Sequence, residues 1–433
     1  MIFVMRSVFC LILICTLVSP AAANTFFTDS HLEWTVRATG EEAKTKGKDT
    51  PETSRIQSAG IGRLYYKSGM FKNFFGVEGV AYHVIPFRYD EKNASNRYGK
   101  DETFFQEGKN GFGKLGIALR IEPNENLRFK YGRMESNHVL LGPGEFRTTP
   151  RMYEMATARV AWQPVVLSMM HVTGASDYSD DGFRTFSTYK SNWENGELEK
   201  QPLQILDLTM EKGPFGFKAA YGRQKNIQNY AFVEASLKQP LNEAWAIGAA
   251  GGFRHKDDER EASKSKDHTL GMWGGEVTIS RHQTWVKIAF SNVEKNPEMF
   301  GTMGTEWVLD GTLFNGCKNN GYYTTGVQGV FNHDGEKASK IEIGQDFETG
   351  ILKGVSLSAY YIEGKNIHHG DEFTNNLRQH EVGGRIAYAV PTVPGLFVEL
   401  KHGRNTMRSD GPYGMDQKME TTLLNLSYAM KLL

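Results

Sequence analysis

Residues 127–162 read LRFKYGRMESNHVLLGPGEFRTTPRMYEMATARVAW, and this stretch decides the fold. At its start Leu127, Phe129 and Tyr131 alternate with Arg128 and Lys130, which is the period of two expected of a β-strand. Such a strand would have one apolar face and one cationic face. A membrane β-barrel needs both faces, because lipid surrounds its outside and water fills its inside.

The stretch ends in a second strand of the same kind. Over residues 156–162, Ala, Val and Trp side chains alternate with Thr157 and Arg159. The segment between the two strands, about 134–151, contains Gly and Pro together with Glu145 and Arg147. We therefore expect two neighbouring barrel strands joined by a long loop.

The amino terminus predicts export. Arg6 gives a basic start, residues 8–18 are apolar except for Thr16, and residues 21–23 are Ala-Ala-Ala, a small-residue cleavage site. The apolar core is too short to span a bilayer as a helix. We interpret residues 1–23 as a cleaved signal peptide.

The remaining residues, 24–433, are expected to form a single domain. Cys317 is its only cysteine, so no internal disulfide can stabilise the exported chain. The 50 Lys and Arg residues balance the 50 Asp and Glu residues, and a net charge of +0 gives no general attraction to nucleic acid. A mean hydropathy of −0.46 is compatible with a barrel, since only alternate strand residues face lipid.

Alternating segments separated by short turns continue along the chain, beginning with His31–Ala38 and ending with Glu420–Leu432. Eight hairpins give sixteen strands, and one further strand at each end makes eighteen. We predict an all-β, transmembrane, antiparallel up-and-down β-barrel of about 18 strands with long outer loops and short periplasmic turns. Pairing of the first strand with the last would leave no open edge in the lipid. The predicted turns fall near residues 67–73, 123–124, 163–164, 211–214, 239–243, 281–283, 348–354 and 391–395.

Aromatic residues recur beside these turns. Because aromatic rings favour the bilayer interface, we interpret them as a girdle at one rim of the barrel; the alternative is the ordinary enrichment of aromatic residues in strands. The residues concerned are Trp162, Phe215, Trp245, Trp285, Phe347 and Phe397.

Three stretches resemble the OprD-type porin family of Gram-negative outer membranes. FFTDSHLEWTVR, beginning at Phe26, is similar to the family's first strand, and NHDGEKASKIEIGQDF with the following GVSLSAYYIEG resembles its late hairpin. The third loop has the family's spacing of an acidic residue, Arg two later, Pro three later and an aromatic residue three further on. Here these residues are Glu145, Arg147, Pro150 and Tyr153.

The resemblance implies a monomeric channel of eighteen strands in which this loop folds inward and narrows the pore. It also implies that a second loop, roughly 294–337, helps to narrow it. Two features depart from the family pattern: residues 142–144 are Gly-Pro-Gly, and the chain ends in Leu433 where a terminal Phe is common.

Strand parity assigns charged residues to the lumen. Five cations on three neighbouring strands would form a basic wall, and carboxylates on late strands would face it. A narrow lumen of low dielectric would then sort solutes by charge; alternatively, these charges pair with one another and keep the lumen hydrated. The cations are Lys114, Arg120, Arg128, Lys130 and Arg159, and the carboxylates are Glu342 and Asp346 with Glu381 and Glu399.

The sequence thus predicts a passive outer-membrane channel for small polar solutes such as amino acids, peptides, sugars or organic ions. Its expected partners are outer-membrane lipid, lipopolysaccharide and the solute, without nucleic acid. We expect no enzyme activity, cofactor or metal, since no GxSxG nucleophile motif is present and His368-His369 is interpreted as a solvated pair. Two alternatives are an outer-membrane barrel hydrolase and a loop-mediated adhesin or receptor. The solute and the preference for anions or cations remain open.

Overall fold

The computed structural model describes residues 26–47, 51–92, 104, 110–141, 148–179, 181–188, 198–258, 268–295, 306–310, 312–315, 323–368, 377–409 and 416–432. The expected signal peptide, Glu145, Arg147 and Cys317 lie outside these residues. Within the described ranges, no helix is both long enough and apolar enough to cross a membrane.

Among the described residues, eighteen strands form one closed ring, with the two-residue strand β8 attached to it. A separate hairpin consists of β15 (Glu306–Leu309) and β16 (Thr312–Asn315). The first half of the ring and its attached strand are β1 (His31–Gly47), β2 (Thr53–Lys67), β3 (Phe75–Lys92), β4 (Phe112–Asn124), β5 (Leu127–Glu135), β6 (Met152–Trp162), β7 (Val165–Ser176), β8 (Arg184–Thr185), β9 (Leu203–Lys212) and β10 (Phe215–Gln224). The second half comprises β11 (Gln228–Pro240), β12 (Trp245–Asp258), β13 (His268–Arg281), β14 (Thr284–Val293), β17 (Lys337–Asp346), β18 (Val355–Ile367), β19 (Leu377–Ala389), β20 (Leu396–Arg408) and β21 (Asp416–Lys431).

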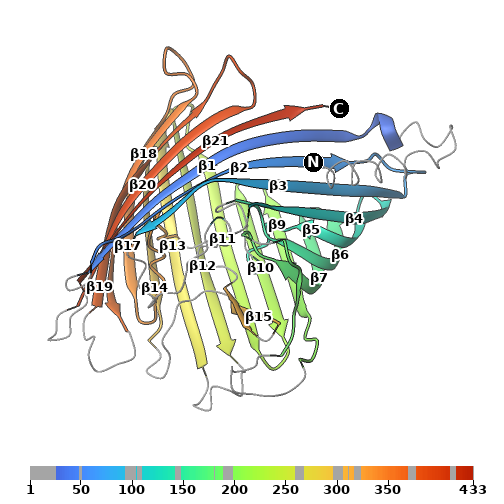
Figure 1. The fold of residues 1–433 in the computed structure, drawn as a ribbon, viewed down its shortest axis with the longest axis horizontal. Coiled ribbons are helices and arrows are strands. Elements are labelled where there is room, and N and C mark those ends of the chain that lie inside the picture. Colours follow the sequence, from blue (N-terminus) through green and yellow to red (C-terminus); the bar gives the residue numbers. More distant parts are fainter. Residues whose placement is uncertain are drawn as a thin grey trace.

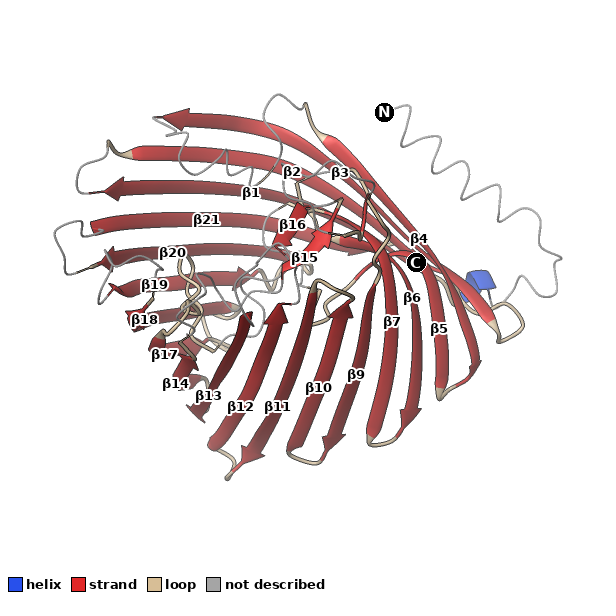
Figure 2. Cartoon of the chain, turned by 90° about the horizontal axis from the view of Figure 1, so that it is seen from below, coloured by secondary structure: helices blue, strands red, loops and turns tan. Residues whose placement is uncertain are grey.

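Antiparallel pairing of β1 with β21 closes the ring, from Glu33 opposite Lys431 to Gly47 opposite Gln417. The two strands lie side by side in Figure 1, and the ring encloses β15 and β16 in Figure 2. Closure satisfies backbone groups that hydrocarbon would otherwise leave without partners. The predicted fold class, including the pairing of the first strand with the last, is confirmed.

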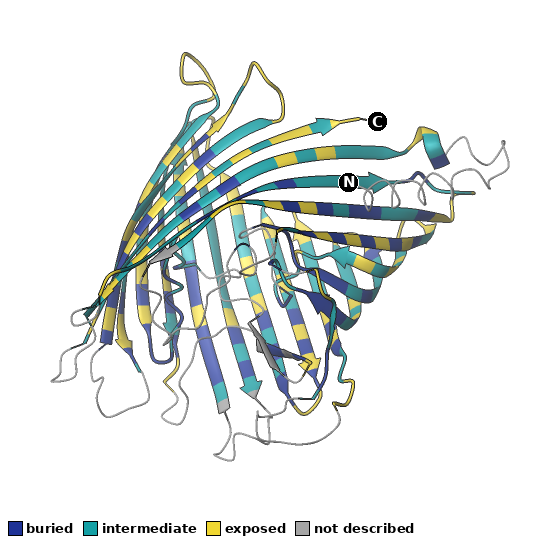
Figure 3. Ribbon diagram, viewed as in Figure 1, coloured by how far each residue is buried: buried dark blue, intermediate teal, exposed yellow. Residues whose placement is uncertain are grey.

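Buried and exposed residues alternate along many strands in Figure 3, as expected when successive side chains point to opposite faces of the ring. On β4, Leu115, Ile117 and Leu119 are exposed, whereas Lys114 and Arg120 on the opposite face are buried. The apolar residues therefore cover the outside, and the charged residues lie inside.

Several strands are longer than the sequence pattern predicted. β1 continues past Ala38 to Gly47, and β3 continues past Val84 to Lys92. Both extensions are at the barrel end remote from the termini. On β1 the outward residues there are polar, so backbone pairing continues after the apolar alternation has ended. On β3 the outward residues Ile85 and Phe87 are still apolar, and a register irregularity beside them interrupts the alternation.

The aromatic residues beside the short turns are not a single girdle. Trp162 and Phe215 are exposed on the outer face, as predicted. Trp285 lies opposite Gly344, and a Cβ added at Gly344 would collide with its ring. Gly344 shares the inner face with Glu342, so Trp285 opposite it also faces the lumen, where the glycine leaves space for its ring. The prediction of a rim position facing lipid was therefore wrong for Trp285.

Candidate functional site in the barrel lumen

An apolar cluster fills one side of the lumen. In the segment after β5, Leu140 and Leu141 are fully buried, and the Trp307 indole N–H donates to the Leu140 carbonyl at 2.8 Å. The Tyr153 hydroxyl donates to the Leu141 carbonyl. At Gly222 a Cβ would meet the Leu140 side chain at 2.9 Å, so the glycine leaves room for this packing.

The cluster attaches both inward segments to the wall. Its strand residues come from the inner faces of β6, β7, β9–β11, β13 and β14. Its other residues come from the segment after β5, from Phe186 just after β8 and from β15. Trp307 and Leu309 of β15 are both buried in it. Burial of these side chains excludes water from this side and leaves the polar walls for a hydrated path.

The end of the same inward segment reaches the opposite part of the wall. The Thr148 hydroxyl donates to the Tyr178 carbonyl at 2.7 Å, and the Thr148 carbonyl accepts a hydrogen bond from Arg37 on β1. Pro150 is buried, and its carbonyl lies 3.4 Å from the Lys114 amino group. Residues 148–150 thus connect β1 and β4 with the segment that follows β7.

Tyr153 differs from its predicted position. It was expected in the loop, but it belongs to β6 and is almost fully buried in the apolar cluster. It holds the loop through Leu141 and does not form part of the loop itself. The family spacing placed an aromatic residue near the constriction without showing where the strand begins.

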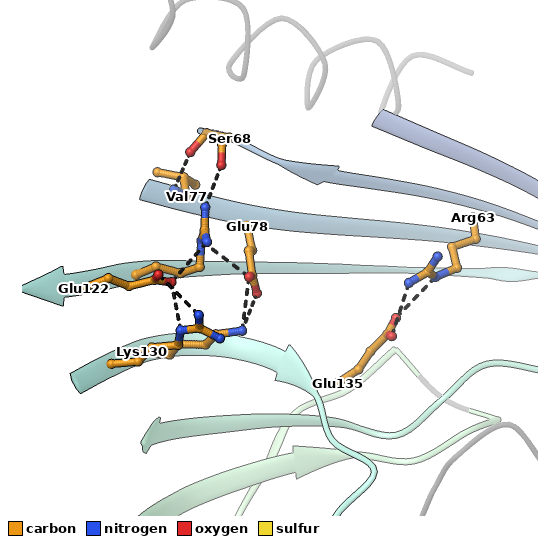
Figure 4. Close-up of polar contacts among 9 residues, drawn as sticks. Arg63, Ser68, Val77, Glu78, Glu122, Lys130 and Glu135 are labelled. Atoms are coloured by element: carbon orange, nitrogen blue, oxygen red, sulfur yellow. Dashed lines mark hydrogen bonds and ion pairs between the residues drawn. The ribbon is translucent and has the colours of Figure 1, made fainter. Parts of the chain in front are cut away.

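The wall formed by β3–β5 contains a network of five charged residues, which we call the wall cluster: Glu78, Arg120, Glu122, Arg128 and Lys130. Lys130 Nζ lies 2.9 Å from Glu78 Oε2, and Arg120 Nε lies 3.4 Å from Glu78 Oε1. Glu122 Oε1 lies 3.2 Å from Arg120 Nη1 and 2.9 Å from Arg128 Nε. Figure 4 shows the two carboxylates between the cations.

These contacts follow from strand register. Ala118 lies opposite Glu78 on β3 and opposite Gly132 on β5, while Arg120 lies opposite Lys130. Side chains opposite one another on the same face have Cβ atoms about 5 Å apart, which allows ion pairs. The wall cluster contains three cations and two carboxylates, so most of its positive charge is neutralised.

The other two predicted cations differ from each other. Lys114 is buried and donates to the Asp177 carbonyl. Arg159 lies opposite Arg128 on the inner face and is half-buried, and no ion pair involves it among the described residues. Among the described residues, no carboxylate thus balances the charge of Arg159.

A second charged group lies beside the wall cluster. Arg63 on β2 pairs with Glu33 on β1 at 3.0 Å and with Glu135 at the end of β5 at 3.4 Å. The Tyr82 hydroxyl donates to Glu135 and accepts from Arg63 at 2.9 Å. Figure 4 shows the Arg63–Glu135 pair spanning the gap between their strands.

A cavity of about 250 Å³ lies between the two groups. Its lining includes Arg63 and Lys130 as cations, Glu78 and Glu135 as carboxylates, and Asn137 from the start of the inward segment. A solute here would meet donors and acceptors of both charges within one small space.

The carboxylates predicted on the late strands also have partners, which are cations for Glu342 and Glu399 and a hydroxyl group for Asp346. Glu342 lies 3.0 Å from the Lys340 amino group, and Asp346 accepts from the Ser356 hydroxyl at 2.6 Å. Glu399 lies 2.7 Å from Arg385. This wall therefore carries cations beside its carboxylates, so the described contacts favour the second interpretation of the sequence, mutual pairing.

Glu381 binds a segment of backbone. Its carboxylate accepts N–H hydrogen bonds from Val327 at 2.7 Å, Gln328 at 3.1 Å and Gly329 at 2.6 Å. It also accepts the Tyr360 hydroxyl at 2.6 Å. Since Glu381 is fully buried, it holds the inner segment, residues 323–336, against β18 and β19.

Two further buried carboxylates fix the end of the inner segment. Glu336 accepts from the Gln379 amide at 2.8 Å and from the His333 N–H at 3.0 Å. Asp334 lies 2.7 Å from His368 Nδ1. Burial raises the pKa of Glu336 to about 7, because an ionised carboxylate loses hydration there.

The most informative residues that the sequence reasoning missed are Glu78, Glu122, Arg63 and Glu135. The strand parity that places the cations of β4–β6 in the lumen also places Glu78 on the inner face of β3. Glu122 and Glu135 lie at strand ends beyond the apolar alternation. The sequence pattern therefore indicated that Glu78 faces the lumen, but it gave only a weak indication for Glu122 and Glu135.

A closed ring with an apolar outside and a charged inside defines the class: a β-barrel that spans a membrane around a polar lumen. The sequence model of the family described as outer membrane porin, OprD family, matches residues 24–432. The chain belongs to this family, which places it in the outer membrane and confirms the resemblance seen in the sequence.

Individual relatives are distant. Membrane-associated protein UidC of Escherichia coli (strain K12) is 24% identical over 233 residues, which cover 50% of this chain and 53% of UidC. The chain thus matches about half the length of that relative.

The solved structures share the fold over nearly the whole chain. Pseudomonas aeruginosa OccK9 (OpdG) has a TM-score of 0.77 at 15% identity, covering 94% of this chain and 100% of that one. Pseudomonas aeruginosa OccK2 (OpdF), solved in complex with glucuronate, has a TM-score of 0.72 at 13% identity with the same coverage, 94% and 100%.

Proposed function

We propose that the protein is a passive outer-membrane channel for small polar solutes, and that its selectivity depends on paired charges and inward segments. The supporting observation is the cavity between Arg63 with Glu135 and Lys130 with Glu78. A solute carrying a carboxylate together with hydroxyl or ammonium groups can exchange hydrogen bonds with both signs of charge there.

The ion pairs determine what kind of selectivity is expected. A continuous row of unpaired cations would attract all anions, whereas paired charges leave a weak net field but keep many directed hydrogen-bonding groups. The channel should therefore discriminate among solutes by size and hydrogen-bonding pattern more than by net charge. Among the five predicted cations, Arg159 would give the clearest local preference for anions.

Further features belong to the same proposal. Residues 1–23 act as a cleaved signal peptide, and residues 24–433 act as one monomeric barrel domain in contact with lipid and lipopolysaccharide. The segment between β5 and β6, including Glu145, Arg147 and Pro150, narrows the path together with the inner segment. The protein has no catalytic activity and needs no cofactor or metal.

Solute permeation into liposomes tests the proposal. The purified mature protein should produce swelling with glucose, glucuronate and alanine, because all three are small and polar. Lys130→Gln should slow glucuronate more than glucose, since it removes a lumen cation. Absence of swelling with any small solute, from a protein that is folded in the liposomes, would contradict channel function.

A further inference from the structure

A charged surface lies on the outside of the barrel, near the ends of β1 and β19–β21 that are remote from the termini. Nearer the termini on this outer face, Val382, Leu400 and Leu424 are exposed apolar residues that would contact lipid. Counting in steps of two along β20 and β21 from the last two places Arg404 and Glu420 on the same face. The surface is thus continuous with the lipid-facing side and is separated from the lumen by the sheet.

Strand register brings basic residues together on this surface. Arg378 lies opposite Arg408, and Lys418 lies opposite Lys46. Glu420 lies between Arg404 on β20 and Lys44 on β1. The strands concerned are side by side in Figure 1. Cβ atoms about 5 Å apart across each pair make one compact group.

We call this group the basic patch; it consists of Lys44, Lys46, Arg378, Arg404, Arg408 and Lys418. Four carboxylates lie among or beside them: Glu42, Glu52, Asp416 and Glu420. Six cations against four carboxylates leave an excess of two positive charges. At the same end of β10–β12, Arg223 and Asp257 lie on the outer face, and the exposed Lys225 follows in the turn after β10.

The ion pairs within the basic patch leave hydrogen-bond donors of its arginines available. Arg404 Nε lies 3.1 Å from Glu420, with 55% of the arginine side chain exposed. Arg408 Nε lies 3.5 Å from Asp416, with 51% exposed. Exposed pairs of this kind are weak, and a guanidinium has five donors. Both arginines can therefore bind a further anion.

We propose that the basic patch binds the phosphate groups of a phosphorylated glycolipid, the lipopolysaccharide of the outer leaflet. The argument is complementarity of two kinds at once. The ligand's acyl chains would lie along the apolar outer face, and its phosphates would reach the cations immediately beyond that face. A soluble anion matches only the second feature. The inference depends on the outer-membrane location and does not depend on the solute that the channel transports.

Binding to glycolipid in detergent tests the inference. The purified mature protein should retain lipopolysaccharide and should unfold at a higher temperature in its presence. The triple variant Arg404→Gln, Arg408→Gln, Lys418→Gln should bind it more weakly, by about fivefold for each charge removed. The matched control is the double variant Arg223→Gln, Lys225→Gln, which removes two exposed cations at the end of β10. It should bind lipopolysaccharide as the unaltered protein does.

Two further arms identify the ligand. Dephosphorylated lipopolysaccharide should bind the unaltered protein as weakly as intact lipopolysaccharide binds the triple variant, and inorganic phosphate alone should not raise the unfolding temperature. Equal binding by the triple variant, equal binding of the dephosphorylated lipid, or full stabilisation by inorganic phosphate would each overturn the inference. Heat-modifiable gel mobility shows that each variant is folded, and the single variant Arg404→Gln serves if the triple variant is not.

Ion conductance keeps this inference distinct from the proposed function. The triple variant should conduct as the unaltered protein does, because its substitutions lie outside the lumen. A protein that binds the glycolipid without conducting would refute the channel and leave the lipid site standing. A protein that conducts without binding the glycolipid would refute the lipid site and leave the channel standing.

Discussion

Glu78 forms ion pairs with Arg120 and Lys130 at once, so the charge balance of the wall cluster depends on it more than on any single cation. We expect Glu78→Gln to shift the reversal potential in a salt gradient toward anion preference, because two cations lose their shared carboxylate. Leaving Arg120 buried without this partner should also lower the unfolding free energy by about 1–3 kcal/mol. Planar-bilayer recordings and urea unfolding measure the two effects.

Glu363→Gln is the control for that substitution. Glu363 pairs with Lys365 at 3.0 Å, and both side chains are substantially exposed. Removing its charge should leave the reversal potential unchanged. An equal shift in both variants would show that the potential does not report on the wall cluster.

Glu336 gives the inner segment a dependence on pH. Its pKa is raised from 4.5 to about 7 by burial, so the docked segment retains a proton that the released segment loses. Docking should be strongest below pH 4.5, weaken between pH 4.5 and about 7, and stay constant above that range. The full change is on the order of 3 kcal/mol.

Hydrogen exchange measures this effect. Protection of the backbone amides in residues 327–336, corrected for intrinsic exchange, should decrease between pH 5 and pH 8. Glu336→Gln should remove most of the decrease, because its amide does not titrate. If the variant keeps the same pH dependence, another group must be responsible.

At the scale of the element, Glu381 holds the inner segment through three backbone N–H groups. Glu381→Ala leaves these donors without an acceptor, so we expect the segment to leave the wall and the single-channel conductance to become larger or noisier. Tyr360→Phe removes only one hydroxyl contact and should have a smaller effect. Unchanged conductance in a folded Glu381→Ala protein would show that the segment does not limit the path.

The strands could be predicted from the alternation in the sequence. The inward segments were expected only from the family resemblance, and their contacts could not be predicted. Alternation is a local pattern, and on β5 it correctly separated Phe129 and Tyr131 from Arg128 and Lys130. The position of Glu381 on an inner face also follows from parity. Its partners are backbone N–H groups more than fifty residues earlier in the chain, and backbone groups leave no signature in the side-chain sequence.

At the scale of the molecule, stability depends on an apolar outer face all around the ring. Ile288 is 60% exposed and lies between Val277 and Ile341, which are exposed as well. We expect Ile288→Arg to destabilise the bilayer-inserted barrel by about 2–4 kcal/mol, as measured by urea unfolding in liposomes. Lys287→Arg, one residue away on the inner face, should have little effect. Equal sensitivity at both positions would contradict the assignment of the two faces.

The central claim is that the chain is an open channel whose lumen charges are largely balanced. The reversal potential of the purified mature protein, measured in a planar bilayer under a potassium chloride gradient, tests it most directly. We expect steady conductance with a reversal potential close to zero, on the side of a weak anion preference because of Arg159. A strong preference for either ion, or no conductance from folded protein, would contradict the account.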